Sequence, residues 1–100
     1  MEKWYQEDWR FKIEILKVGV NNNPRNCRLG FEPGDVFESE YETPAGFCPT
    51  SFIEIFPVME LVRNGGDLRN MGRDGVSSIS FLCPDGIVRF NLTVERNKHA

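Results

Sequence analysis

One segment decides the fold: Thr43-Pro-Ala-Gly-Phe-Cys-Pro-Thr-Ser-Phe-Ile-Glu-Ile-Phe-Pro-Val-Met-Glu-Leu-Val-Arg-Asn-Gly-Gly66. It predicts a tight turn over residues 44–46, followed by a helix. The helix is expected to begin near Pro49, because a proline lacks the N–H that would stay unpaired in the first helical turn. Gly65 or Gly66 is expected to end it. This is the one strong helix pattern in the chain, so we expect the other segments to pack against it.

Apolar residues in this segment recur at helical spacing and predict the face that packs on the core. Pro57 lies in the middle, where a proline removes one backbone hydrogen bond and clashes with the carbonyl four residues earlier. We therefore expect a kink at Pro57 or two short helices. The predicted core face comprises Phe52, Ile55, Phe56, Met59 and Val62, widened by Ile53 and Val58, and the predicted solvent face is marked by Glu54, Glu60 and Arg63.

Four other segments have the alternating or turn-bounded apolar pattern of strands. The last two flank Cys83-Pro-Asp-Gly86, a favoured turn sequence, and should pair as a hairpin. The sequence therefore predicts an α+β fold of order β-β-α-β-β, a small antiparallel sheet covered on one face by one kinked central helix. The strands and their expected inward residues are 11–18 (Phe11, Ile13, Ile15), 36–41 (Phe37, Tyr41), 76–82 (Ile79, Phe81) and 87–95 (Val88, Phe90, Leu92, Val94).

The length of 100 residues predicts one domain, over residues 10–96, with an aromatic arm at 1–9 and a short tail at 97–100. Twelve basic and fifteen acidic residues give a net charge of −3, which argues against a nucleic-acid partner. No stretch approaches the roughly 20 apolar residues that span a bilayer, and the N-terminus lacks the apolar centre of a secretion signal. We therefore expect no membrane contact and a cytoplasmic location. Trp4 and Trp9 favour a homodimer.

Cys48 is the residue most suggestive of chemistry. At or near the helix N-cap, a thiol is close to unpaired N–H groups and to the positive end of the helix dipole, and both favour the thiolate. Thiolate is the form that attacks electrophiles or binds a metal. The alternative is that Cys48 is a small buried apolar residue without a chemical role.

Cys27 and Cys83 are predicted at junctions between loops and strands, where they could join Cys48 in one site. An odd number of cysteines in a reducing compartment argues against a disulfide framework. Three thiols with a fourth ligand could hold zinc or an iron–sulfur cluster, although the chain has no C-x-x-C pair. The sole histidine, His99, is next to the C-terminus, so a Cys/His catalytic pair would require the tail to fold back.

The order and spacing of several motifs resemble a family of small uncharacterised prokaryotic proteins. The resemblance covers residues 10–96 and implies that the three cysteine positions share a site; it implies no activity. After the two glycines, family members often carry an aromatic residue, a proline and a tryptophan, whereas this chain has Asp67-Leu-Arg-Asn70. The matching motifs are Cys27-Arg-Leu-Gly30, Gly34-Asp35, Thr43-Pro-Ala-Gly-Phe-Cys-Pro49, Gly65-Gly66 and Cys83-Pro-Asp85.

Three functions remain open from the sequence. The first is a non-catalytic binding or accessory domain with a cysteine-lined metal or small-ligand site near Cys48. The second is a homo-oligomeric protein–protein interaction module with structural cysteines. The third is a small enzyme that uses Cys48 as its nucleophile. We expect a binding domain rather than an enzyme.

Overall fold

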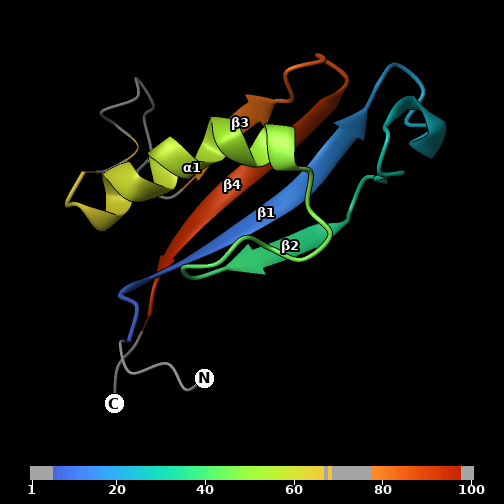
Figure 1. Cartoon of the computed structure of the whole chain (residues 1–100). Coiled ribbons are helices and arrows are strands. Elements are labelled where there is room, and N and C mark those ends of the chain that lie inside the picture. Colours follow the sequence, from blue (N-terminus) through green and yellow to red (C-terminus); the bar gives the residue numbers. More distant parts are fainter. Residues whose placement is uncertain (1–5, 67, 69–77, 98–100) are drawn as a thin grey trace.

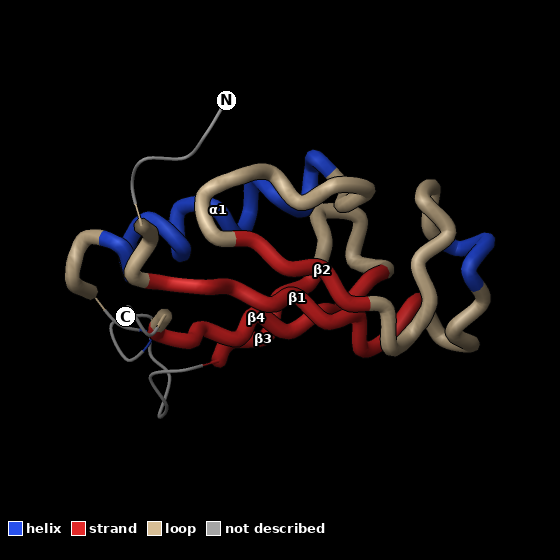
Figure 2. Tube along the Cα trace, turned by 90° about the horizontal axis from the view of Figure 1, so that it is seen from below, coloured by secondary structure: helices blue, strands red, loops and turns tan. Residues whose placement is uncertain are grey.

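A four-stranded antiparallel sheet forms one layer of the structure and a single helix forms the other (Figures 1 and 2). The computed structural model describes residues 6–66, 68 and 78–97. This arrangement confirms the predicted α+β fold and its β-β-α-β-β order. The elements are β1 (Trp9–Val18), the 3-10 helix η1 (Pro24–Asn26), β2 (Val36–Ser39), α1 (Pro49–Arg63), β3 (Ser78–Leu82) and β4 (Val88–Arg96).

The strand order is β2-β1-β4-β3, with every neighbouring pair antiparallel. β3 and β4 form the predicted hairpin, and the long strands β1 and β4 pair in the centre. Ile13 lies opposite Leu92, and Ile15 lies opposite Phe90. Because side chains alternate between the two faces of a strand, this register gathers the apolar residues of both strands on one face.

The core lies between this sheet face and α1. All the inward residues predicted for β1 and β4 are buried. A fully buried side chain of this size contributes about 1.5–3 kcal/mol relative to exposure, so these strands supply much of the stability. The buried apolar residues are Phe11, Ile13, Ile15, Val18, Phe31, Phe47, Ile55, Val58, Met59, Val62, Leu68, Ile79, Val88, Phe90, Leu92 and Val94.

The buried face of α1 is rotated from the predicted one. The helix continues through Pro57 as one element, so the alternative of two short helices is wrong. Phe56 is 37% exposed and Ile53 is 69% exposed. The rings of Phe52 and Phe56 pack on each other, with centroids 5.6 Å apart, at the flank of the core. The helix buries Ser51, Ile55, Val58, Met59 and Val62.

The edge strands differ in length from the prediction. β2 ends at Ser39, which is buried and donates its hydroxyl to the Glu42 carbonyl, 2.5 Å away. Tyr41 therefore lies beyond the strand and is 58% exposed, so its predicted inward position is wrong. β3 begins at Ser78, and the rest of the predicted strand and the preceding loop lie outside the described residues, apart from Leu68.

The two described ends of the chain meet beside β1 and β4. Trp9 is the first residue of β1, and the Arg96 guanidinium lies 5.2 Å from the centre of its ring. The backbone N–H of Asn97 donates to the Asp8 carbonyl at 2.8 Å, and its side-chain amide donates to the Glu7 carbonyl at 2.9 Å. These bonds form a terminal clasp. Residues 1–5 of the predicted arm and residues 98–100 lie outside the described residues.

The C-terminal end of α1 is closed by its own backbone. Gly65 donates to the Val62 carbonyl and Gly66 to the Leu61 carbonyl, at 3.1 and 2.9 Å. These are the two bonds of a Schellman motif, which requires a left-handed residue just after the helix. Gly65 supplies it, with a φ of +94°. The predicted glycine stop is confirmed.

Arg63 is not on a solvent face, which corrects the prediction for this residue. Its guanidinium lies over the rings of Phe11, Tyr41 and Phe56, at 4.9, 4.7 and 5.9 Å from their centres. The same group donates to the Glu60 carboxylate and to the Glu40 carbonyl. The side chain is 12% exposed. Arginine can be buried in this way because its flat cation stacks on aromatic faces.

Candidate functional site

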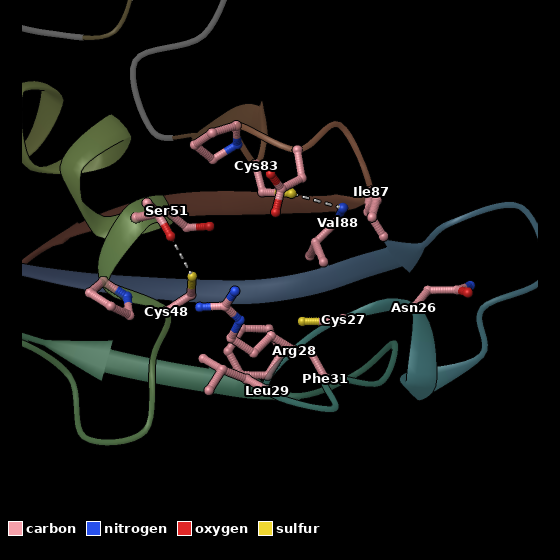
Figure 3. Close-up of a pocket in the computed structure, with 14 residues that line it drawn as sticks. Asn26, Cys27, Arg28, Leu29, Phe31, Cys48, Ser51, Cys83, Ile87 and Val88 are labelled. Atoms are coloured by element: carbon pink, nitrogen blue, oxygen red, sulfur yellow. Dashed lines mark hydrogen bonds between the residues drawn. The ribbon is translucent and has the colours of Figure 1, made fainter.

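A pocket of about 270 Å³ lies where the N-terminal end of α1 meets residues 26–31 and the β3–β4 turn (Figure 3). Cys27, Cys48 and Cys83 all line it, which is the convergence that the sequence analysis raised. Figure 3 shows their sulfur atoms on different sides of the same space. The lining is Asn26, Cys27, Arg28, Leu29, Phe31, Cys48, Pro49, Thr50, Ser51, Cys83, Pro84, Asp85, Ile87 and Val88.

The turn before α1 fixes the position of Cys48. Phe47 donates its backbone N–H to the Pro44 carbonyl at 3.2 Å, and Gly46 has a φ of +79°, which glycine adopts readily. Cys48 then has extended backbone angles and is the N-cap, with Pro49 at the start of the helix. The predicted turn and the predicted N-cap position are both confirmed.

Phe47 anchors this turn in the core. Its ring is stacked with Phe31 at 5.9 Å and lies edge-on to Phe90 at 5.8 Å. Phe37 packs against both Phe31 and Phe47, at 5.2 Å from each. Aromatic pairs of this kind add about 0.5–1.5 kcal/mol each beyond the area they bury. One pocket wall, Phe31, and the residue before Cys48 therefore belong to one rigid cluster.

The environment of Cys48 favours its thiolate. Partial burial raises the pKa of the Cys48 thiol, but interactions with the hydroxyls and backbone N–H groups of Thr50 and Ser51 outweigh it. The net result is a pKa below the ordinary value of a thiol. The Thr50 hydroxyl lies 3.2 Å from Sγ, while the thiol makes no capping hydrogen bond of normal geometry to the helix backbone. Cys48 thus combines a charge-stabilising site with a sulfur open to the pocket.

Cys83 lies on the opposite side, in the turn of the β3–β4 hairpin. Its carbonyl accepts from Gly86 at 2.8 Å, which closes the predicted Cys83-Pro-Asp-Gly86 turn. Its sulfur accepts the backbone N–H of Val88 at 3.2 Å. That bond holds the sulfur against the hairpin backbone, whereas the Cys48 sulfur contacts the Thr50 hydroxyl.

Cys27 and Arg28 belong to the loop after β1 and line the pocket from that side. Asparagine side chains hold this loop: Asn23 caps η1 through the Arg25 N–H, and Asn26 donates to the Val18 carbonyl at 3.3 Å. Cys27 follows η1 and its carbonyl accepts from Gly30 at 2.9 Å. In Figure 3 the guanidinium of Arg28 extends into the space between Cys27 and Cys48.

The described residues give no support to the predicted zinc or iron–sulfur centre. Within residues 6–66, 68 and 78–97, no group of three or more His, Cys, Asp or Glu side chains is arranged to hold a metal ion. The three thiols share a pocket, but they do not form a set of ligands around one point. His99, considered as a further ligand, lies outside the described residues.

Three residues that give this pocket its polarity were not predicted from the sequence: Arg28, Thr50 and Ser51. Thr50 and Ser51 could have been predicted from their position in the first helical turn after Cys48, where hydroxyls and N–H groups surround the side chain of the N-cap residue. Arg28 could be suspected only as the neighbour of Cys27. None of these residues belongs to a recognised catalytic motif.

Comparison with protein-family models, with curated proteins and with solved structures finds no match to this chain. Among the described residues, no helix has the length and apolar character needed to cross a membrane. Arguments about function therefore rest on the pocket itself.

Proposed function

We propose that this protein is a small binding domain whose pocket takes a small ligand with an apolar body and an anionic group. The observation that carries the proposal is one pocket in which Arg28, the N-terminal end of α1 and three thiols face a common space. Small-ligand sites commonly combine an apolar lining with a few polar groups that fix orientation.

The charges in the pocket favour an anion on the Cys48 side. Arg28 supplies a cation, and the first turn of α1 supplies the positive end of a helix dipole. Asp85 is the carboxylate of the lining and belongs to the hairpin turn on the Cys83 side. A ligand should therefore place its negative group near Arg28 and Thr50. Leu29, Phe31, Ile87 and Val88 supply apolar contacts for the remainder.

A matched pair of probes tests this proposal. Benzoate and benzamide have nearly the same shape, but only benzoate is an anion. In NMR titrations of the full chain, we expect benzoate to shift the amides of residues 26–29 and 48–51 saturably and benzamide to bind more weakly. Arg28→Gln should remove the preference, while Arg25→Gln, which changes an exposed arginine outside the pocket, should retain it. Equal binding of both probes, or shifts elsewhere on the protein, would contradict the proposal.

Metal analysis separates this proposal from the metal-binding version predicted from the sequence. We expect protein purified without an affinity tag to contain far less than one equivalent of zinc or iron. Stoichiometric metal that is lost in Cys27→Ser, Cys48→Ser or Cys83→Ser would instead establish a metal site.

A homodimer is a second candidate, because apolar side chains are exposed on α1 and beside it. Ile53 and Tyr41 are 69% and 58% exposed, and Tyr41 and Phe56 share the Arg63 guanidinium. Light scattering at micromolar concentration tests it: a dimer should dissociate in Ile53→Glu and persist in Val20→Glu, a change at an exposed residue in the loop after β1. A monomeric native protein excludes this candidate.

The small-enzyme alternative depends on Cys48 as nucleophile. The lowered pKa of Cys48 favours attack, but the described pocket contains no histidine to act as its base. Binding is thus the function that the described pocket supports best.

A further inference from the structure

We infer that Cys48 is a site of reversible S-thiolation, at which the pocket selects small acidic disulfides. This inference rests on the proposed function, because the ligand that the pocket binds would be the disulfide itself. In the reaction, the Cys48 thiolate attacks one sulfur of RS–SR. A Cys48–S–S–R bond forms, the original S–S bond breaks, and RS⁻ leaves. Cys48 is oxidised and the small disulfide is reduced, so no other reactant is needed.

Hydrogen bonding distinguishes Cys48 from Cys83. The sulfur of Cys83 accepts a hydrogen bond from the Val88 backbone and is held against the hairpin. Cys48 lies at the N-cap, where its sulfur contacts the Thr50 hydroxyl at 3.2 Å and faces the pocket. The Thr50 hydroxyl can rotate and keep donating while the sulfur shifts toward an incoming disulfide. Thiol–disulfide exchange depends on such access as well as on the thiolate fraction.

The pocket also explains why an acidic disulfide is preferred. A disulfide approaching Cys48 passes the guanidinium of Arg28, which extends into the same space. Leu29 and Phe31 border that approach with apolar surface. A carboxylate on the disulfide would pair with Arg28, and its apolar part would contact the other two side chains. The same cation would favour departure of the negatively charged RS⁻.

The pKa of Cys48 supports this assignment. The local hydrogen-bonding groups lower it below the ordinary thiol value, which raises the thiolate fraction near neutral pH. Lowering is the direction that suits exchange, because the best attacking thiol has a pKa closer to neutral pH than an ordinary thiol.

Two chromogenic disulfides provide the test. Dithionitrobenzoate is an aromatic disulfide with two carboxylates, and dithiodipyridine is an uncharged aromatic disulfide. Each is mixed with the full-length protein, release of the coloured thiol is followed in time, and peptide mass spectrometry locates the first modified cysteine. The variants are Arg28→Gln, the matched control Arg25→Gln, and Cys48→Ser.

We expect Cys48 to be modified first by both reagents, and dithiothreitol to restore the free thiol. The ratio of the dithionitrobenzoate rate to the dithiodipyridine rate should fall about three- to fivefold in Arg28→Gln, the size expected for one partly exposed charge contact. Arg25→Gln should leave the ratio unchanged. First modification at Cys27 or Cys83, or a ratio unaffected by Arg28→Gln, would overturn the inference.

Benzoate titration of Cys48→Ser distinguishes failure of this inference from failure of the proposed function. That variant keeps Arg28 and the pocket walls but has no thiol at position 48. Saturable benzoate shifts in Cys48→Ser, together with unselective thiolation of the native protein, would overturn S-thiolation and leave the binding function standing. Loss of both would overturn both.

Discussion

The two ends of α1 differ in how completely they are capped. At the C-terminal end, Gly65 and Gly66 satisfy the last carbonyls and Arg63 is stacked among three rings. At the N-terminal end, the cap residue Cys48 makes no capping hydrogen bond of normal geometry, and the first turn borders a pocket. A serine or aspartate would be the stabilising choice there.

In the function proposed above, the C-terminal end serves stability and the N-terminal end serves binding and thiol chemistry. A closed helix end contributes to folding but offers no group to a ligand. An N-terminal end with a weak cap keeps N–H groups and a thiolate-stabilising field available. On this division, changes at the C-terminal end should lower stability without altering thiol reactivity, and changes at the N-terminal end should alter thiol reactivity without lowering stability.

The largest effect is expected for Arg63→Ala. It removes three cation–π contacts and the bonds to Glu60 and the Glu40 carbonyl. We expect a loss of about 2–4 kcal/mol in the free energy of unfolding, measured by urea denaturation. The labelling rate of Cys48 should not change. Arg25→Ala is the control and should cost about 0.5 kcal/mol or less. A small loss for Arg63→Ala would mean that its stacking contributes little.

Gly65→Ala should have the next largest effect, because alanine is strained at a φ of +94°. We expect it to lower the free energy of unfolding by about 1–2 kcal/mol. Gly30→Ala is the control, because Gly30 also has a positive φ but lies in the loop after η1 and ends no α-helix. Its loss of stability measures backbone strain alone, and any larger loss in Gly65→Ala measures the Schellman motif. If both variants lose the same free energy, the Schellman bonds add nothing measurable.

Cys48→Ser should stabilise the protein by about 0.5–1 kcal/mol, because serine is a far better N-cap than cysteine. The advantage should depend on pH. The lowered pKa of Cys48 makes the folded chain release its thiol proton before the unfolded chain does, so the thiolate adds stability as pH rises past the folded pKa. That contribution is complete above the unfolded pKa and absent at lower pH. Urea denaturation at several pH values should show the stabilisation of Cys48→Ser shrinking as pH rises through that window.

Thr50→Val should have the smallest effect on stability and a clear effect on chemistry. It removes the hydroxyl 3.2 Å from Sγ, so the pKa of Cys48 should rise. In iodoacetamide labelling followed against pH, the midpoint for Cys48 should move to higher pH than in the native protein. Thr93→Val, on a central strand away from the pocket, is the control. An unchanged midpoint would show that the Thr50 hydroxyl does not stabilise the thiolate.

Local periodicity was sufficient to predict the inward faces of the central strands β1 and β4 but not the side of the helix that packs on them. In β4, alternation alone identifies Val88, Phe90, Leu92 and Val94 as inward, because the period of a strand is two. In α1, apolarity favoured Phe52 and Phe56, yet the buried stripe contains Ser51. Which side of a helix is buried depends on the surface opposite it, which no local pattern contains.

The site was predictable only in part for a similar reason. Cys48 could be identified because Pro49 and the apolar run placed it at a helix N-cap. Its convergence with Cys27 and Cys83 depends on the loop after β1 and the β3–β4 turn lying at the same end of the sheet, which follows from the strand order. Arg63 shows the same limit, since two of its ring partners, Phe11 and Tyr41, are distant in sequence.

The terminal clasp between Asn97 and residues 7 and 8 has a practical consequence. It lies at one end of the sheet, while the N-terminal end of α1 and its pocket lie at the other (Figures 1 and 2). A fluorescent label or an immobilisation tether attached at the clasp end of the sheet would be held away from Cys48. The protein can therefore be fixed to a sensor surface with its pocket facing the solution.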